Sequence, residues 1–201
     1  MFEKLENEKE LKINPLFSIW LSPRKTFRYA LEHKSLKYSL SLAAISGTFF
    51  FLEDITVSTP LWLFILSILV LGPVIGLIIL GIEAAINTWI GKLFDGEGNY
   101  KEMTHAMGIS SISEICLAPF WILSAVVLYN DLFTESFVWD IVYWSIYSIH
   151  FIWTVVIHIK GIAEVHKFSS WRGFATYVVG LITIIVLLIP IMIALMALYY
   201  N

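Results

Sequence analysis

Four ionisable side chains lie inside the long apolar stretches of this 201-residue chain: Glu83, Glu114, His150 and His158. An ionisable group within a membrane span costs free energy, starting at about 2 to 3 kcal/mol, so it normally faces other helices and finds a partner there. Carboxylates and imidazoles are oxygen and nitrogen ligands for divalent metals, and both also carry protons. These residue types therefore indicate three kinds of chemistry: hydrogen bonding between helices, metal binding, and proton or ion transfer.

Helical periodicity places these side chains on polar faces. At 100° per residue, the stretch 61–90 has Gly72, Gly76, Glu83 and Asn87 within roughly 60° of one another. The stretch 141–159 and its continuation carry a second polar face of Tyr143, Tyr147, His150, Thr154, His158 and Gly161. Counted from the flanking basic residues, most of these groups lie in the same half of the membrane. We therefore expect one polar cluster of Glu83, Asn87, Glu114, His150 and His158.

Three interpretations of this cluster stay open. The first is structural, since polar side chains hydrogen-bond across membrane helices and fix their packing at around 1 kcal/mol or less each. The second is a divalent metal such as zinc, with Glu83, Glu114, His150 and His158 as ligands, although no contiguous ligand motif supports it. The third is a proton or ion path that uses carboxylates beside titratable imidazoles. No other cofactor is expected.

Catalysis is not expected. The chain has no His-Glu-x-x-His, no Gly-x-Ser-x-Gly and no glycine-rich phosphate loop. Ser113 and His150 are the one pair that resembles a nucleophile and its base, but serine is common in membrane helices as a packing residue. The only cysteine, Cys116, lies in an apolar run and provides neither an intrachain disulfide nor a thiolate metal site.

The elements that must position these residues are membrane helices. With 58% apolar residues, the chain has too little polar surface to cover a water-soluble globule. A helix needs roughly 20 apolar residues to cross a bilayer. The runs that meet or approach this length are 36–52, 61–90, 107–129, 141–159 and 175–199. They predict an all-α membrane protein with a bundle of five transmembrane helices.

The basic residues predict the orientation of this bundle. All 13 Lys and Arg residues lie in the segments 1–37, 91–108 and 160–173. Short cytosolic loops retain Lys and Arg, whereas acidic residues say little about the side of the membrane. We therefore expect a multi-pass protein of the cell (plasma) membrane with its N-terminus in the cytosol and its C-terminus outside.

The segment before the first span has its own pattern. Ser22 and Pro23 are typical of the N-cap and N1 positions of a helix. Arg24, Lys25 and Arg28 alternate with large apolar residues, which predicts an amphipathic interfacial helix on anionic headgroups. Its basic residues are either ordinary anchors or a site for lipids or partners. We divide the chain into a cytosolic N-terminal segment, 1–35, and a transmembrane domain, 36–201.

Three segments together carry a resemblance to a known family. They are Ser-Pro-Arg-Lys-Thr-Phe at 22–27, Gly-Lys-Leu-Phe-Asp-Gly-Glu-Gly-Asn-Tyr at 91–100, and the stretch from Gly108 to Pro119. This layout, over about residues 15–198, resembles the Yip family of Ypt/Rab-interacting membrane proteins. The resemblance implies five membrane helices and a cytosolic N-terminus. In eukaryotic members it also implies roles in transport between endoplasmic reticulum and Golgi through Rab-type GTPases.

The short N-terminal region departs from eukaryotic members and is more like the prokaryotic ones, so GTPase binding is not carried over. We expect a non-enzymatic scaffold or organiser that binds proteins or lipids at the cytosolic face. The alternative is a small transporter or a metal- or proton-binding membrane protein built on the Glu/His cluster. The expected partners are the lipid bilayer and, beyond it, other membrane proteins or further copies of the chain, but not nucleic acid.

Overall fold

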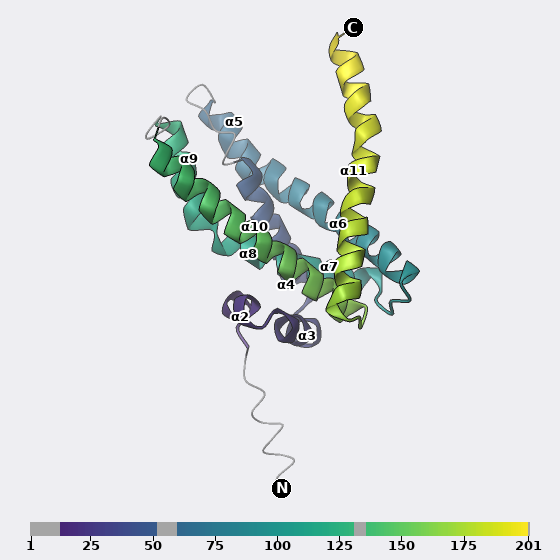
Figure 1. Ribbon diagram of the computed structural model, residues 1–201. Helices are drawn as coiled ribbons and strands as arrows, with labels where there is room; N and C mark the ends of the chain where they lie inside the picture. Colours follow the sequence, from purple (N-terminus) through teal and green to yellow (C-terminus); the bar gives the residue numbers. More distant parts are fainter. Residues whose placement is uncertain (1–12, 52–59, 131–135, 201) are drawn as a thin grey trace.

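Helices account for all the regular secondary structure in residues 13–51, 60–130 and 136–200, the part of the chain that the structure describes (Figure 1). The structure is a computed structural model. The all-α expectation is therefore confirmed for these residues. The acidic loop residues Glu53, Asp54, Asp131 and Glu135 lie outside them.

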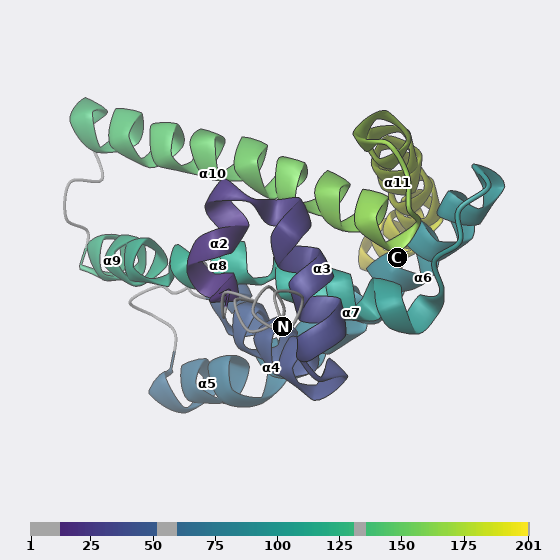
Figure 2. The same cartoon turned by 90° about the horizontal axis from the view of Figure 1, so that it is seen from below.

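Two short helices precede the long ones. Helix α2 (Pro15–Leu21) begins with the Asn14 side chain accepting a hydrogen bond from the Leu16 N–H, and α3 (Pro23–His33) begins at Pro23 with Ser22 as N-cap. The helix therefore starts at the predicted residue, but the Ser22 side chain makes no capping hydrogen bond. The expected single interfacial helix is therefore two helices, joined at Ser22. Figures 1 and 2 show both lying across the ends of the longer helices, below α7 and α8.

The next helices form a first up-and-down pair. Helix α4 (Leu36–Gly47) continues into the 3₁₀ turn η1 (Thr48–Phe51), and α5 (Leu61–Leu66) leads through the π-helical turn η2 (Ser67–Leu71) into α6 (Gly72–Leu93). The π-turn directly precedes Pro73, whose ring removes one backbone donor and disturbs the preceding turn. The helix therefore changes its hydrogen-bond pattern just before Gly72-Pro73.

The third apolar run is broken twice. Helix α7 (Tyr100–Ser110) begins with a capping box between Asn99 and Glu102 and ends before Ser111. Helices α8 (Ile112–Cys116) and α9 (Ala118–Tyr129) follow, and the axis bends by 48° between Tyr100–Cys116 and Ala118–Val127. The predicted start at residue 107 is thus too late, and the expected single straight helix is a bent series.

The last two helices are the longest, α10 (Phe137–Val165) and α11 (Ser170–Tyr200). Three helices are long and apolar enough to cross a membrane, namely Trp62–Leu93, Phe137–Val165 and Ser170–Ala194, and the bent pair of the third run makes up to four. The 12 residues of α4 reach about 18 Å, short of a hydrocarbon core of about 30 Å. The described residues therefore provide three or four of the five expected crossings.

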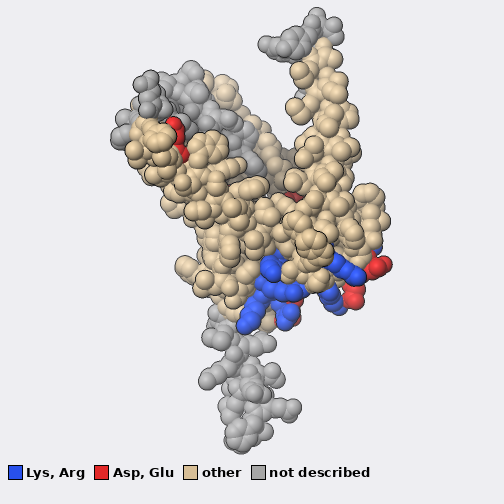
Figure 3. Space-filling view, in the orientation of Figure 1, with Lys and Arg blue, Asp and Glu red and all other residues tan. Residues whose placement is uncertain are grey.

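Helix α7 lies at the centre of the packing. Its residues from Met103 to Ser110 are all buried, and it packs against α3, α4, α6 and α10. Phe27 of α3 and Ile19 of α2 are fully buried in the same apolar cluster as Met103 and Met107. Helix α3 thus buries its apolar face against protein, and α2 buries Ile19 but exposes Phe17 and Leu21. The Lys and Arg side chains gather at the end of the molecule seen at the bottom of Figure 3.

Candidate functional site

A cavity of about 430 Å³ lies between α4, α6, the α7–α9 series and α10. Four of the predicted polar residues line it: Glu83, Glu114, His150 and His158. The rest of the lining combines small, hydroxyl, large aliphatic and aromatic side chains: Ala43, Ser46, Phe49, Gly76, Ile79, Leu80, Met107, Ser110, Ser111, Trp121, Tyr147, Phe151 and Thr154. The structure therefore brings carboxylates from two helices to one cavity, opposite two imidazoles that share one face of α10.

The first carboxylate–imidazole pair joins α6 to α10. The His158 Nε2 atom lies 3.6 Å from Glu83 Oε1, and its Nδ1 atom lies 2.9 Å from the Thr154 carbonyl oxygen. Because a carbonyl oxygen only accepts, Nδ1 carries the hydrogen and donates it to Thr154. Nε2 then attracts the carboxylate only when a proton lies on one of the two groups. The pair therefore brings a carboxylate of α6 and an imidazole of α10 together at the cavity.

The second pair joins α8 to α10 and ends a directed chain of hydrogen bonds. The Ser113 hydroxyl donates to the Ser110 carbonyl at 2.9 Å, and the Thr154 hydroxyl donates to Ser113 Oγ at 3.3 Å. His150 Nε2 lies 3.3 Å from Thr154 Oγ1 and 3.7 Å from Glu114 Oε1. Since the Thr154 hydrogen is already committed, Nε2 donates, and its N–H also faces the carboxylate. Ser113 thus serves as a link in this chain.

The metal interpretation needs at least three ligands at one point. Within the described ranges, no three His, Cys, Asp or Glu side chains converge closely enough to hold a metal ion. The four candidate ligands form two pairs about two turns apart on α10 rather than one ligand set. The arrangement therefore provides two separate hydrogen-bond acceptor sites, Glu83 and Glu114, that face one cavity.

Asn87 does not line this cavity. Its Nδ2 atom donates to the Glu83 carbonyl of its own helix at 2.9 Å, and its Oδ1 atom is buried without a hydrogen-bond partner. A Cβ atom added at Gly180 of α11 would lie 3.1 Å from this Oδ1. Glu83 and Asn87 thus lie within roughly 60° on the helical wheel but face different parts of the structure. Glu83 faces the cavity, and Asn87 faces α11.

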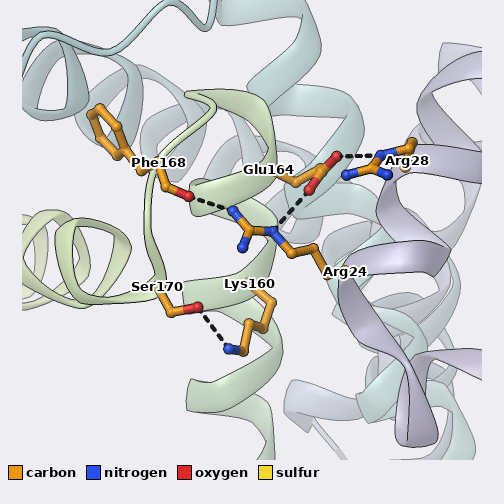
Figure 4. Close-up of polar contacts among 6 residues, drawn as sticks. All are labelled: Arg24, Arg28, Lys160, Glu164, Phe168 and Ser170. Atoms are coloured by element: carbon orange, nitrogen blue, oxygen red, sulfur yellow. Dashed lines mark hydrogen bonds and ion pairs between the residues drawn. The ribbon is translucent and has the colours of Figure 1, made fainter.

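The predicted basic residues form a second site at the end of α10 (Figure 4). Glu164 accepts from Arg24 Nε at 3.0 Å and from Arg28 Nε at 2.8 Å, and Arg24 also donates to the Phe168 carbonyl. The hydrogen bond to Glu164 and its negative charge raise the pKa of Arg28. Arg24 and Arg28 therefore fasten α3 to α10, whereas Lys25 is exposed. The sequence analysis missed Glu164, whose only signal is an acidic residue within a basic segment.

His166, also missed, joins the two loops at this end. Its ring is fully buried against Gly91, Gly96 and Gly98. A Cβ atom added at Gly91 or Gly96 would clash with the ring, and one added at Gly98 would clash with Val165. The Gly98 N–H donates to Nδ1 at 3.2 Å, so Nε2 carries the hydrogen and donates to the Asn87 carbonyl at 3.1 Å. Burial, and secondarily the charge of Lys92, lower the pKa of His166. Gly91 and Gly96 therefore make room for this ring.

Long apolar helices, a broken third helix and basic residues gathered at one end define a multi-pass membrane protein in contact with the lipid bilayer. The family model of the Yip1 domain matches residues 17–193, so this chain belongs to the Yip1 family, as its resemblance indicated. Neither the curated proteins nor the solved structures contain a significant match to the chain.

Proposed function

We propose that this Yip1-family protein is a non-enzymatic membrane scaffold that binds proteins or anionic lipids at its cytosolic face. In this proposal the chain crosses the cell membrane five times, with α4 and η1 in the first crossing. Its N-terminus is in the cytosol and its C-terminus is outside. The basic end of the molecule in Figure 3 then faces the cytosol.

The observation that carries this proposal is the layer formed by α2 and α3. It lies across the ends of the long helices and is fastened to α10 through Glu164. Lys25 of α3 is exposed, and so is Lys37 at the start of the adjoining helix α4. Each basic residue near an anionic surface contributes about 1 kcal/mol of attraction. A fixed layer presents these charges in one plane without the entropy cost of ordering a loose segment. Such a surface suits anionic headgroups or an acidic partner segment.

The test is the binding of anionic lipid to the full chain. We expect native mass spectrometry of the purified protein to show phosphatidylglycerol retained over phosphatidylcholine, and the double variant Lys25→Glu/Lys37→Glu to lose this preference. Asp140→Lys, which adds a basic residue at the opposite end, serves as the control and should leave the preference intact. Equal retention by the wild type and the double variant would remove the lipid-binding part of the proposal.

The alternative function, a small transporter or a metal- or proton-binding protein, is favoured by one observation: two carboxylate–imidazole pairs face the same cavity. For this function we expect proton or metal flux into liposomes to fall at least tenfold in the double variant Glu83→Gln/Glu114→Gln. Elemental analysis of the purified protein reports any bound zinc separately. Unchanged flux together with no bound metal would leave the scaffold as the remaining proposal.

A further inference from the structure

The two carboxylates of the cavity are more exposed than the two imidazoles that contact them. The Glu83 and Glu114 side chains are 28% and 36% exposed, whereas those of His158 and His150 are 14% and 7% exposed. None of the residues that line the cavity is Lys or Arg. A ligand that enters therefore meets carboxylate oxygens first, each beside an imidazole and with no Lys or Arg in the lining.

The size of the cavity fits a small organic group. Its volume of about 430 Å³ lies within the range of about 300 to 1,000 Å³ that is usual for small-molecule pockets. Trp121, Tyr147 and Phe151 supply aromatic wall, and Trp121 packs edge-on against both Tyr147 and His150. Aromatic faces attract cations that have lost part of their water. Carboxylates and aromatic rings in one cavity are the combination that recognises an organic cation.

The third span is interrupted where it meets this cavity. Helix α7 ends at Ser110 and α8 begins at Ile112, and Ser110, Ser111 and Glu114 all line the cavity. Irregular backbone at membrane depth is tolerated where it is buried in protein or lines a cavity. Interrupted helices of this kind form the ligand sites of many membrane proteins. The break is an observation independent of the acidic side chains, and it marks the same place.

We propose that this cavity binds an organic ammonium group. The ammonium is held by the carboxylate of one pair, Glu83 beside His158 or Glu114 beside His150, and the rest of the ligand packs against the aromatic wall. A metal ion would need three ligands at one point, whereas an ammonium group needs only acceptors and nearby negative charge. The same chemistry is present in the ethanolamine headgroup of a membrane lipid and in small soluble amines. This site is independent of the scaffold role and requires no transport.

The experiment measures binding to the purified full chain in detergent. By native mass spectrometry we expect phosphatidylethanolamine to be retained at least tenfold better than a synthetic phospholipid of the same acyl chains whose headgroup is uncharged. At least one of the variants Glu83→Gln and Glu114→Gln should reduce this retention at least tenfold, and the one that does identifies the carboxylate that holds the ammonium. Glu97→Gln, an exposed carboxylate outside the cavity, is the matched control and should retain the lipid like the wild type.

Free ethanolamine separates the two sources of the ammonium group. If it binds in isothermal titration and displaces the lipid, soluble amines are ligands, whereas lipid binding without this competition identifies the headgroup. Ser46→Leu fills part of the cavity without removing a carboxylate, so it tests the site even where a glutamine variant does not fold. Retention that is equal for the two lipids, or unchanged in every cavity variant that folds, would overturn the inference.

Discussion

Glu164 is the residue through which the N-terminal helices are attached to the membrane helices. Its side chain is only 12% exposed and receives Arg24 and Arg28 from two successive turns of α3. Removing this carboxylate would leave two guanidinium groups facing each other with no counter-charge. The contrast is the Lys167–Glu97 pair at the same end, where the atoms approach to 2.7 Å but both side chains are exposed.

We predict that Glu164→Gln lowers the free energy of unfolding by about 1 to 2 kcal/mol, because it weakens two charge-assisted hydrogen bonds whose donors are partly solvated. Glu97→Gln should change it by no more than about 0.5 kcal/mol, since an exposed ion pair contributes little. Thermal unfolding of both variants in the same detergent measures the difference. Equal shifts would mean that α3 is held by its apolar face alone.

His166 makes stability depend on pH. Its pKa in the folded protein lies below the ordinary value of 6.5, because the buried ring must stay neutral for Nδ1 to accept from Gly98. Above about pH 6.5 both folded and unfolded chains hold it neutral and its contribution is complete. As the pH falls from 6.5 toward the lowered folded-state pKa, only the unfolded chain gains the proton, so stability decreases.

We therefore expect the melting temperature of the wild type to fall between pH 7.5 and pH 5.5. His166→Gln should be less stable at both values, because it loses the ring that fills the glycine pocket, but its melting temperature should fall less over the same interval. The quantity compared between the two proteins is the change of melting temperature with pH, not the melting temperature itself. Parallel slopes in the two proteins would exclude His166 as the group responsible.

At the scale of elements, the contact between α4 and α6 depends on three glycines. A Cβ added at Gly72 would lie 2.7 Å from the Thr48 Cα, and one added at Gly76 would lie 2.9 Å from the Gly47 Cα. Small residues allow membrane helices to approach this closely and to gain van der Waals contact along their backbones. Since α4 is short, this close contact is the main attachment of its second half.

Gly76→Ala should destabilise the protein by about 1 to 3 kcal/mol, because the added methyl group overpacks a contact between two backbones. Gly81→Ala on the same helix is the matched control, since its Cβ would meet only the Tyr100 hydroxyl at 3.5 Å, an ordinary contact. We expect the control to be neutral or slightly stabilising, as Ala favours a helix over Gly. Circular dichroism melts of the two variants decide between these outcomes.

The position and the faces of a helix could be predicted from the sequence where the helix is regular and depends only on residues close to one another in the chain. Helix α10 runs unbroken, so the 100° rule places His150, Thr154 and His158 on the face that the structure turns to the cavity. The break at Leu117 directly precedes Ala118-Pro119, a helix-start signal that the sequence analysis did not use, whereas the break at Ser111 has no adjacent Pro or Gly to mark it. The partners of Glu164 and His166 lie 68 to 140 residues away in sequence, beyond the reach of local patterns.

At the scale of the whole molecule, the segregation of charge predicts topology. We expect a cysteine at position 25, in a Cys116→Ser background, to react with a membrane-impermeant maleimide only after the cells are permeabilised. A cysteine at position 201 should react in intact cells, since an odd number of crossings puts the two ends on opposite sides. Labelling of both positions from the same side would contradict the five-crossing proposal.

The attachment through Glu164 also has a mechanical meaning. Helix α10 carries Glu164 at one end and both cavity imidazoles along its length, so a movement of α3 is transmitted through Glu164 to a helix that lines the cavity. If a ligand bound to the layer of α2 and α3 shifts α10, it changes the affinity of the cavity for its own ligand. By thermodynamic reciprocity, a ligand in the cavity then changes the affinity of the surface layer by the same factor.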